Sequence, residues 1–377
     1  MSKKKKLTVK SMPVYQPLLD DLLSSFKNGT IKPGQWLLGE NALAREYGIG
    51  HLSVRKALGF LEKEGYIKRM PGRGTQVLEK PADLTEILIL CLKPYYDAEI
   101  SENSFYLPVI NIIRGLARKQ GIITKLIYHD WLEDTDPQEY WSSITFSKST
   151  GVILVGETQP QCIPDLSLIS GPAVQVDHRI PGLALDSVEP DNFESGRMMA
   201  AHLAGLGHTQ MVYLGWHLEK EYNPERVKGV LQGLKESSIP GLAAEPAACT
   251  LGMGDDDPAS GYTAMKDILD KGVSFTGVMT YDHQIALGAI RAMEKADIQV
   301  PEDVSVICAA PETVYDNSGR PLTHVTIDRE GIARHAFERL LWRFEHMNKP
   351  PEELKNPVLL IPGATSMRMK EHAEKDI

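Results

Sequence analysis

Two short cationic segments near the start of the chain carry side chains suited to recognising a polyanion. In the first segment, Ser53, Arg55 and Lys56 lie off an apolar stripe whose helical spacing predicts a helix over residues 52–64. The stripe consists of Val54, Leu58 and Leu61. Arginine suits a guanine edge or a phosphate, and lysine suits a phosphate. The pattern predicts a helix that packs by one face and presents the other to nucleic acid.

The second cationic segment is the turn Pro71-Gly-Arg-Gly74. Extended runs at Tyr66–Met70 and Thr75–Leu78 flank it, which predicts a hairpin with Arg73 at its tip. Glycine on both sides of the arginine allows close approach of the backbone, and Arg73 can then reach a phosphate or the minor groove. The segment therefore predicts a second basic contact.

These two segments need elements that hold them. Apolar spacing predicts earlier helices at Val14–Phe26 and Glu40–Tyr47, with Gly29 and Gly48 as their stops. Three helices followed by a hairpin are the layout of a winged helix-turn-helix. The alternative is a helical hairpin in another all-α context with solvated charges, but the whole ordered set favours the winged helix.

The charge distribution separates the start of the chain from the rest. The net charge is −9, yet residues 1–80 hold 15 Lys and Arg against 7 Asp and Glu, a net of +8. The remainder holds 26 against 43, a net of −17. A basic head on an acidic body suggests that only the head meets a polyanion. A solvated basic tail is the alternative, because Lys3–Lys6 supply half of the excess.

Length and cysteine usage restrict the remaining function classes. A chain of 377 residues is too long for one core of ordinary size, so two or three domains are expected. Its four cysteines are far apart and form no C-x-x-C pair, so we expect no metal site, no disulfide framework and no cofactor. No apolar run reaches the ~18–20 residues of a membrane span. A cytoplasmic location is the expectation.

Residues 13–77 resemble the winged helix of the GntR family. The matching pieces are Gly29, Lys32-Pro-Gly34, Leu37, Glu40, Leu43-Ala44, Tyr47-Gly-Ile49, Ser53-Val-Arg-Lys-Ala-Leu58, Leu61-Glu62, Glu64-Gly65 and Gly72-Arg-Gly-Thr75. The chain departs from the family at Leu38-Gly39, Asn41 and Gly50-His51-Leu52. The departures imply an unusual operator. The DNA-contacting set that follows is Asn41, His51, Leu52, Ser53, Arg55, Lys56, Gly72, Arg73 and Gly74.

The rest of the chain alternates short apolar runs with helical patterns. Candidate strands are Glu86–Cys91, Thr124–Tyr128, Gly151–Val155, Ala173–Val176, Met211–Leu214, Gly277–Thr280, Val304–Cys308 and His324–Ile327. Candidate helices are Pro108–Gln120, Asn192–Leu206, Glu225–Ser237, Gly261–Lys271, Asp282–Ala296 and Glu330–Phe344. Repeated β-α-β units predict an α/β body of two lobes, each a parallel sheet flanked by helices. Ligands of such folds bind at the carboxyl ends of the strands, here between the lobes.

This body resembles the effector domain of the LacI/GalR repressors, which is itself similar to periplasmic binding proteins. The matching pieces are Val176-Asp177, Val188-Glu-Pro-Asp-Asn192, Gly196, Ala201-His-Leu203, Leu206-Gly-His208, Tyr213-Leu-Gly215, Arg226, Gly229, Ile285-Ala-Leu-Gly288, Val300-Pro-Glu-Asp-Val-Ser-Val306 and Pro321-Leu-Thr323. A GntR head on such a body resembles the arabinose-repressor type of architecture. The resemblance implies a dimer that binds operator DNA and a small-molecule effector.

The same resemblance implies an effector site. The positions matching Asp177 and Arg226 bind the sugar in the family, although Asp177 could instead cap local backbone and Arg226 could be a surface residue. Asp282 and His283 stand where the family carries Asn-Asp, and a helix N-cap by Asp282 is the alternative. The family's Gly-Phe/Tyr-Asp-Asp is replaced by Cys308-Ala-Ala-Pro311, which removes one usual polar contact.

Aromatic residues after strand ends could stack on a ligand ring or serve as plain packing. The candidates are Trp216, Tyr95, Tyr96 and Phe105, and Trp216 is included in the expected effector site.

We expect a basic tail at residues 1–12, a winged helix at 13–79, a linker at 80–84 and the effector domain at 85–370. Lobe 1 is expected at 85–188 and 309–331, and lobe 2 at 189–308 and 332–370.

The sequence favours a ligand-responsive regulator of transcription, most simply a repressor of carbohydrate-utilisation genes. A regulator of a non-sugar pathway is the alternative. An enzyme is disfavoured because no P-loop, G-x-S-x-G, H-E-x-x-H or Rossmann fingerprint is present. A transport binding protein conflicts with the basic head and with the missing signal-peptide pattern.

Overall fold

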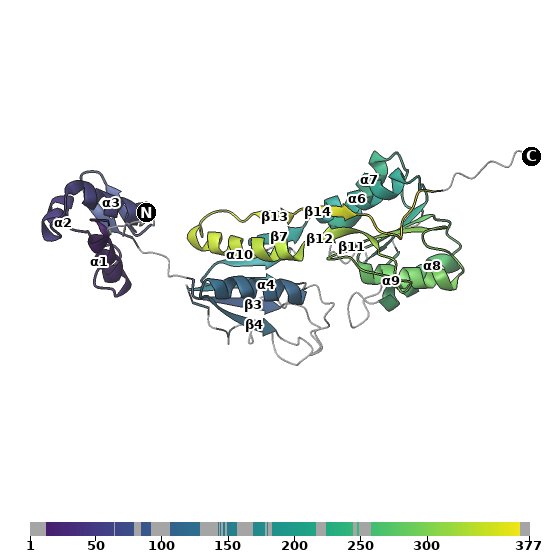
Figure 1. Cartoon of the computed structure of the whole chain (residues 1–377), viewed down its shortest axis with the longest axis horizontal. Helices are drawn as coiled ribbons and strands as arrows, with labels where there is room; N and C mark the ends of the chain where they lie inside the picture. The colour runs from purple at the N-terminus through teal and green to yellow at the C-terminus, as the bar shows by residue number, and fades with distance from the viewer. Residues whose placement is uncertain are drawn as a thin grey trace, which may run out of the picture. The chain divides into compact units, whose positions relative to one another are not determined.

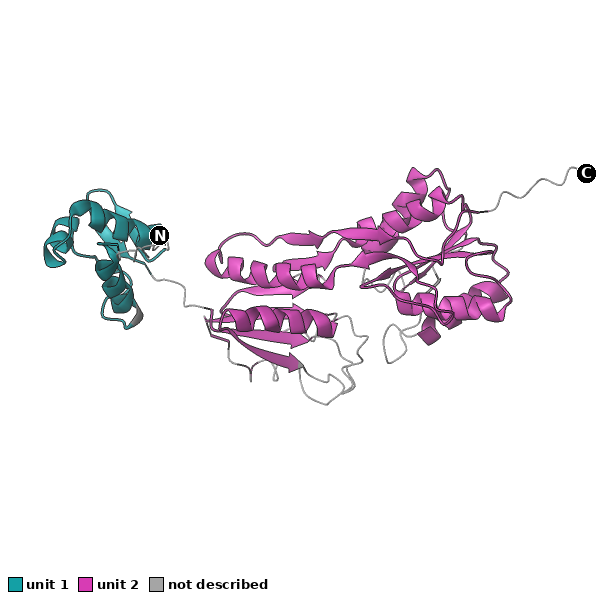
Figure 2. Ribbon diagram, viewed as in Figure 1, with its two compact units in different colours: residues 1–82 teal, residues 83–377 magenta. Residues whose placement is uncertain are grey.

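The computed structural model describes residues 13–63, 65–78, 84–91, 106–128, 142, 144, 146–147, 149–156, 169–177, 179, 183–215, 224–243, 247–248 and 258–369 (Figure 1). The chain divides into two compact units, residues 1–82 and 83–377 (Figure 2). The division falls within the segment 80–84 that the sequence marked as a linker.

The first unit, the head, is built on three helices: α1 (Gln16–Lys27), α2 (Glu40–Glu46) and α3 (His51–Lys63). Their apolar faces form one core, in which Leu18, Val54 and Leu61 are fully buried. Gly48, between α2 and α3, has a φ of +61°, a backbone conformation that glycine adopts without strain. The predicted helical stripe of α3 is therefore the stripe that packs.

A small sheet completes the head. Strands β1 (Ile67–Met70) and β2 (Gly74–Val77) pair antiparallel, with Ile67 opposite Val77. Both of those side chains are buried against the helices. The hairpin turn is closed by a hydrogen bond of 3.0 Å from the Arg73 amide to the Met70 carbonyl oxygen. These elements form a winged helix-turn-helix.

The first lobe of the second unit holds a six-stranded parallel sheet in the order β13-β7-β6-β5-β3-β4. Its strands are β3 (Glu86–Cys91), β4 (Ile123–Tyr128), β5 (Thr150–Val155), β6 (Ala173–Val176), β7 (Asp186–Pro190) and β13 (Glu353–Asn356). Helices α4 (Tyr106–Lys119) and α10 (Arg329–Glu345) lie side by side on one face, and α10 packs on β5, β6 and β7 (Figure 1). Burial on both faces explains the continuous apolar runs of β3 and β5.

The second lobe holds another six-stranded sheet, in the order β14-β12-β11-β10-β8-β9, in which only β14 is antiparallel to its neighbour. Its strands are β8 (Met211–Gly215), β9 (Ala247–Ala248), β10 (Gly277–Thr280), β11 (Ser305–Ala310), β12 (Thr323–Ile327) and β14 (Val358–Ile361). Helices α6 (Asn192–Gly205) and α7 (Pro224–Glu236) pack together, as do α8 (Pro258–Asp270) and α9 (His283–Lys295). Alternate strand residues face the two helix pairs, since Tyr213 joins the core with α6 and α7 and Val212 joins the core with α8 and α9.

The chain crosses between the lobes after β7, after β12 and between β13 and β14. The buried Asn356 lies on the third crossing and contacts the other two. Its carbonyl oxygen accepts from the Asp191 amide at 2.9 Å, and its side-chain amide donates to the Asp328 carbonyl oxygen at 3.4 Å. One residue thereby ties all three crossings.

This strand order corrects the expected lobe assignment. We expected residues 309–331 in lobe 1, but β12 pairs with β11 in the sheet of lobe 2. We expected residues 332–370 in lobe 2, but most of α10 and all of β13 belong to lobe 1. The chain leaves lobe 2 at Asp328, which caps α10, and returns at Asn356.

Candidate DNA-binding surface and effector site

The side of α3 away from the core carries the side chains that the sequence assigned to DNA. His51, Arg55 and Lys56 are exposed, Ser53 is half-buried, and Leu52 is 76% exposed. Asn41 is exposed at the start of α2. Leu52 is an exposed apolar side chain at the start of a basic helix, a position that a DNA groove would cover. The structure therefore brings the predicted polar and apolar groups of α3 onto one accessible surface.

Arg55 is held in place by Glu40 on the neighbouring helix. Its Nε atom donates to Glu40 Oε2 at 2.8 Å, and this hydrogen bond raises the pKa of the Arg55 guanidinium above its usual value. The Arg55 side chain is still 63% exposed, so its remaining N–H groups face solvent. Glu40 was part of the family motif, but sequence reasoning did not assign it this role.

The wing presents Arg73 between two glycines with left-handed backbone. Gly72 has a φ of +74° and Gly74 a φ of +110°, values that side chains with a β-carbon rarely tolerate. All three residues are exposed. Glycine is therefore required for the shape of this turn, and not only for close approach to a partner.

In the body, Asp177 follows β6, at the carboxyl end of the first sheet. Its φ is +73°, it is 9% exposed, and its Oδ2 atom accepts a hydrogen bond of 2.9 Å from the Tyr106 hydroxyl. Tyr106 begins α4 on the same lobe. The hydrogen bond with Tyr106 gives Asp177 a polar partner that the sequence did not indicate.

Arg226 lies in the first turn of α7 and is only 3% exposed. Its guanidinium donates to Asn192 Oδ1 and to the Tyr281 carbonyl oxygen, and it lies 4.2 Å from the centre of the Tyr281 ring. The buried Nε atom has no hydrogen-bond partner among the described residues. The surface alternative for Arg226 is excluded, and Asn192 and Tyr281 join the site as residues that the sequence missed.

The two remaining polar candidates lie at the start of α9. Asp282 caps that helix by accepting from the Ile285 amide at 2.8 Å, the alternative that the sequence left open. His283 is the first helical residue and is half-buried. Both follow β10, as does Tyr281, so they lie at the same sheet edge as the contact of Arg226 with the Tyr281 carbonyl.

The segment that replaces the family's polar motif is apolar in structure as well. Cys308, Ala309 and Ala310 are all buried at the end of β11. Burial raises the pKa of the Cys308 thiol, with a further increase from Asp282 and a decrease from Arg226. Trp216, Tyr95, Tyr96 and Phe105 lie outside the described residues.

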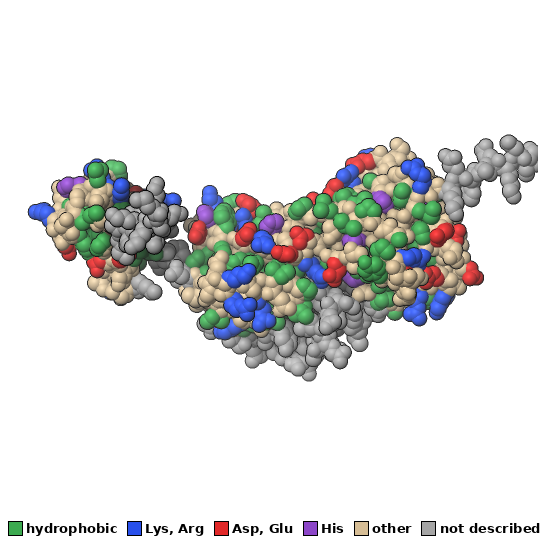
Figure 3. Space-filling view, in the orientation of Figure 1, with side chains coloured by type: hydrophobic (Ala, Val, Ile, Leu, Met, Phe, Trp, Pro, Cys, Tyr) green, Lys and Arg blue, Asp and Glu red, His purple; other side chains and the backbone are tan. Residues whose placement is uncertain are grey.

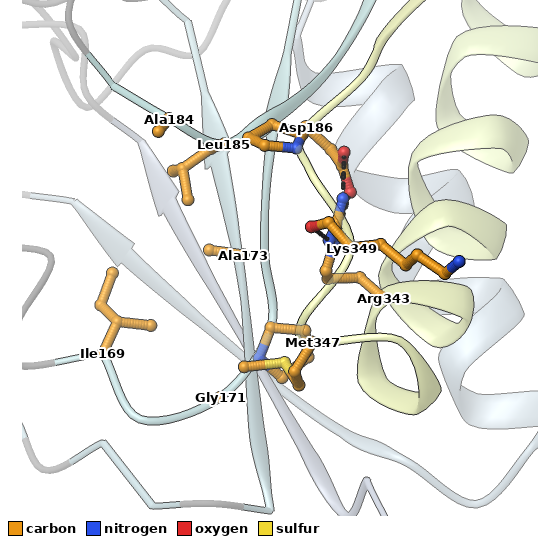
Figure 4. A pocket seen from close by; sticks show the side chains of 11 residues that line it. Ile169, Gly171, Ala173, Ala184, Leu185, Asp186, Arg343, Met347 and Lys349 are labelled. Carbon is orange, nitrogen blue, oxygen red and sulfur yellow. Dashed lines mark hydrogen bonds and ion pairs between the residues drawn. The ribbon is translucent and has the colours of Figure 1, made fainter.

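A cavity of about 160 Å³ lies at the opposite, amino-terminal ends of β6 and β7 (Figure 4). Asp186 and Arg343 line it, and their charged groups are paired through two hydrogen bonds of 2.6 Å. Ile169, Leu185 and Met347 supply apolar lining. The ion pair links α10 to the sheet, and both of its charges are satisfied. This cavity is separate from the site at which the effector is expected to bind.

Within the described part of the chain, no group of His, Cys, Asp and Glu is arranged to hold a metal ion. None of the helices in this described part is both long and apolar enough to cross a membrane. On the face of the body seen in Figure 3, cationic and anionic side chains are interspersed.

Fold and sites together define a DNA-binding head joined to a two-lobed ligand-binding body. The gntR family of bacterial regulatory proteins matches residues 13–77, and the periplasmic binding protein-like domain matches residues 200–366. The chain thus joins a gntR-type helix-turn-helix to a periplasmic-binding-protein-like domain.

Two known relatives align with most of the chain. The chain is 23% identical over 322 residues to the HTH-type transcriptional repressor MelR of Bacillus subtilis (strain 168), covering 84% of this chain and 89% of that protein. It is 22% identical over 372 residues to the arabinose metabolism transcriptional repressor of Geobacillus stearothermophilus, covering 94% and 98%. The crystal structure of the Lac repressor dimer bound to operator and the anti-inducer ONPF has a TM-score of 0.58 and 18% identity, covering 76% of this chain and 95% of that chain.

Proposed function

We propose that this protein is a ligand-responsive transcription regulator, a repressor whose head binds operator DNA and whose body binds a small-molecule effector. The observation that carries the proposal is the exposed basic surface of α3 and the wing on a gntR-type head. The repressor assignment is supported by the names of the two relatives. Because it binds DNA in a bacterial setting, the protein acts in the cytoplasm, and it needs no catalytic activity.

The DNA contacts in this proposal are the predicted set on α2, α3 and the wing. Arg55 contacts a guanine edge or phosphate with the N–H groups that Glu40 leaves accessible. Arg73 contacts the backbone or the minor groove from the wing tip. Two heads of a homodimer would bind the two halves of a palindromic operator.

A carbohydrate is the proposed effector. Sugars are bound through paired hydroxyls, and the region around Arg226 offers carboxylate, carboxamide and guanidinium groups at the carboxyl ends of the strands. The buried and unsatisfied Nε of Arg226 supports a ligand there, since an unmet buried donor costs about 1–3 kcal/mol. The proposed contacts are Asp177, Arg226, Asp282, His283 and Trp216. A non-sugar effector is the second candidate, favoured by the apolar Cys308-Ala-Ala310 segment.

Binding of the full-length protein to the DNA upstream of its own gene tests the first part of this proposal. Gel shifts at low salt are expected to show a specific complex that weakens as salt rises. Substituting Arg55→Ala is expected to weaken it, while Lys266→Ala on the body leaves it unchanged. Absence of any complex at low salt contradicts the assignment.

Thermal unfolding with pentoses, hexoses, uronic acids and short oligosaccharides tests the second part. A sugar that binds the native body is expected to raise its melting temperature. Asp177→Asn keeps a residue type that tolerates the left-handed backbone, so it is expected to abolish the shift while preserving DNA binding. A shift that persists undiminished in Asp177→Asn places the sugar elsewhere.

A further inference from the structure

The wing of the head has a third strand-like segment that the sequence did not indicate. Residues 34–37 run antiparallel to β2, and Trp36 lies opposite Gln76. The Leu37 amide donates to the Thr75 carbonyl oxygen, and the Val77 amide donates to the Gln35 carbonyl oxygen, both at 2.8 Å. The chain before α2 is therefore part of the wing sheet.

The register places Trp36 on the outer face of this sheet. Gln76 lies between Trp36 on one side and Lys68 on the other, so the three side chains share one face. The opposite face holds Ile67 and Val77, which are buried in the head core. The outer face remains accessible, and the Trp36 side chain is 49% exposed.

The indole ring of Trp36 also reaches diagonally to the base of the wing turn. A β-carbon built on Gly74 would lie 3.4 Å from Trp36 Cε3 and 3.8 Å from Cζ3, so the ring lies against the bare backbone of Gly74. Gly74 directly follows Arg73 and has a φ of +110°. The Trp36 ring thus packs against Gly74, whose backbone conformation sets the direction of the wing turn.

We propose that Trp36 is a positioning residue for DNA binding, whose indole ring holds the Gly72–Gly74 turn in the orientation that lets Arg73 reach the DNA backbone. The proposal rests on the proposed function of the head and extends it to a neutral residue outside α3 and the hairpin. Glycines at 72 and 74 give the turn many alternative conformations, and a ring packed on Gly74 removes part of that freedom before DNA arrives.

The test is a double-mutant cycle on the full-length protein. Fluorescence anisotropy measures its affinity for a fluorescein-labelled duplex that the wild-type protein has selected from a random-sequence pool, over a series of KCl concentrations. Arg73→Ala is expected to weaken binding about fivefold and to reduce the slope of log affinity against log salt by about 0.9, the effect of one lost phosphate contact. Trp36→Ala is expected to reduce the affinity and the salt slope by similar amounts, although it removes no charge.

The cycle and the controls separate positioning from stability. Adding Trp36→Ala to Arg73→Ala is expected to lower the affinity less than twofold further. Trp36→Phe, which keeps a ring, is expected to retain most of the salt slope. Leu23→Ala, at a half-buried site on α1, is expected to lower the melting temperature of the head without changing the slope. Circular dichroism establishes that each variant is folded, and Trp36→Leu replaces the alanine variant if that one is unfolded.

Additive effects of the two substitutions, or a wild-type salt slope in a folded variant without the ring, overturn the proposal. Failure to select any duplex is a different result, because it removes the DNA-binding function itself and the role of Trp36 with it.

Discussion

Gly196 on α6 lets two helices touch, and through that contact it fixes where Arg226 lies. A β-carbon at Gly196 would lie 1.9 Å from the Arg226 carbonyl oxygen, and one at Gly229 on α7 would lie 1.9 Å from the Phe193 carbonyl oxygen. The two glycines face each other's helix, so the backbones approach more closely than side chains would permit. The Arg226 guanidinium can then reach Asn192 at the start of α6.

Substituting Gly196→Ala is therefore expected to force α6 and α7 apart. Overpacking of this severity is expected to lower the free energy of unfolding by about 3 kcal/mol. The matched control is Gly205→Ala, at the exposed last residue of the same helix, where no atom lies within 4 Å of the new methyl group. That control is expected to stabilise by about 0.5–1 kcal/mol. Urea unfolding of both variants measures the contrast, and equal effects would contradict the packing argument.

Chemistry and motif together singled out Arg226 from the sequence, and its role as an effector contact stays a prediction. Arg226, singled out as an effector contact, does lie with its side chain at a sheet edge among polar groups. Asn192 and Trp36 were not singled out, because their roles depend on neighbours distant in the sequence: Asn192 meets Arg226 across two helices, and Trp36 meets Gly74 across a sheet. Pairings of this kind have no local pattern.

At the scale of elements, helix α10 is attached to the first sheet by a buried charge cluster. Asp186, at the start of β7, accepts from Arg343 at 2.6 Å and from Arg339 at 3.0 Å, and also from the Glu352 amide at 2.8 Å. Burial acts to raise the pKa of the Asp186 carboxyl, but the hydrogen bonds from Arg343 and Arg339 outweigh it, and the pKa is lowered. The ionised carboxylate is the form that joins helix to sheet.

Asp186→Asn is expected to destabilise the body by about 3–5 kcal/mol near neutral pH, because the buried Arg343 loses its counter-charge and Arg339 keeps only Glu352. A lowered pKa contributes stability above the unfolded-state value of about 3.9, and this contribution is lost as pH falls through the lower folded value. The difference in free energy of unfolding between wild type and variant, measured in urea, is therefore expected to decrease as pH falls below about 4.

The exposed pair of Asp267 with Lys271 is the control for this effect. Both side chains are more than half exposed, so Asp267→Asn is expected to change stability little at any pH. If the difference in free energy of unfolding between wild type and Asp186→Asn stayed constant from pH 7 downward, the ionised carboxylate would not be the source of the stabilisation.

The elements that the sequence predicted were those with a clear period. The eight candidate strands and six candidate helices of the body all coincide with elements of the structure, with ends shifted by a few residues at most. The strands β7, β9, β13 and β14 were missed, and β9 is only two residues long. The first, Asp-Ser-Val-Glu-Pro, contains a proline and two acids, and β13 and β14 are four-residue strands at sheet edges. Pairing with a neighbour, rather than composition, makes β7 and β13 strands.

At the scale of the molecule, the two-lobed architecture followed from repeated β-α-β units, but the path between the lobes did not. Deciding which lobe receives β12 or α10 requires knowing which strands pair. The third crossing, at Asn356, could not be predicted because it joins β13 and β14, two strands that the sequence analysis missed. The Asn356 carbonyl oxygen accepts from Asp191, far away in the sequence, and its side chain donates to Asp328, 28 residues before it.

The separation of charge along the chain is a property of the whole molecule that governs how it meets DNA. Residues 1–80 carry a net +8 and the remainder a net −17, so the body is repelled by the same phosphates that attract the head. The cations of the body are offset locally, as in the pair of Lys266 with Asp270. Counterion release on binding should consequently come from the head alone.

This origin of counterion release predicts which cations set the salt dependence of full-length binding. Lys56→Ala, which removes an exposed cation of α3, is expected to reduce the slope of log affinity against log salt by about 0.9. Lys266→Ala removes an exposed cation of the body and is expected to leave the slope unchanged. Anisotropy titrations of both variants on one labelled duplex measure the difference. A slope that falls equally in the two variants would place DNA against the body as well, in conflict with a head that reads DNA alone.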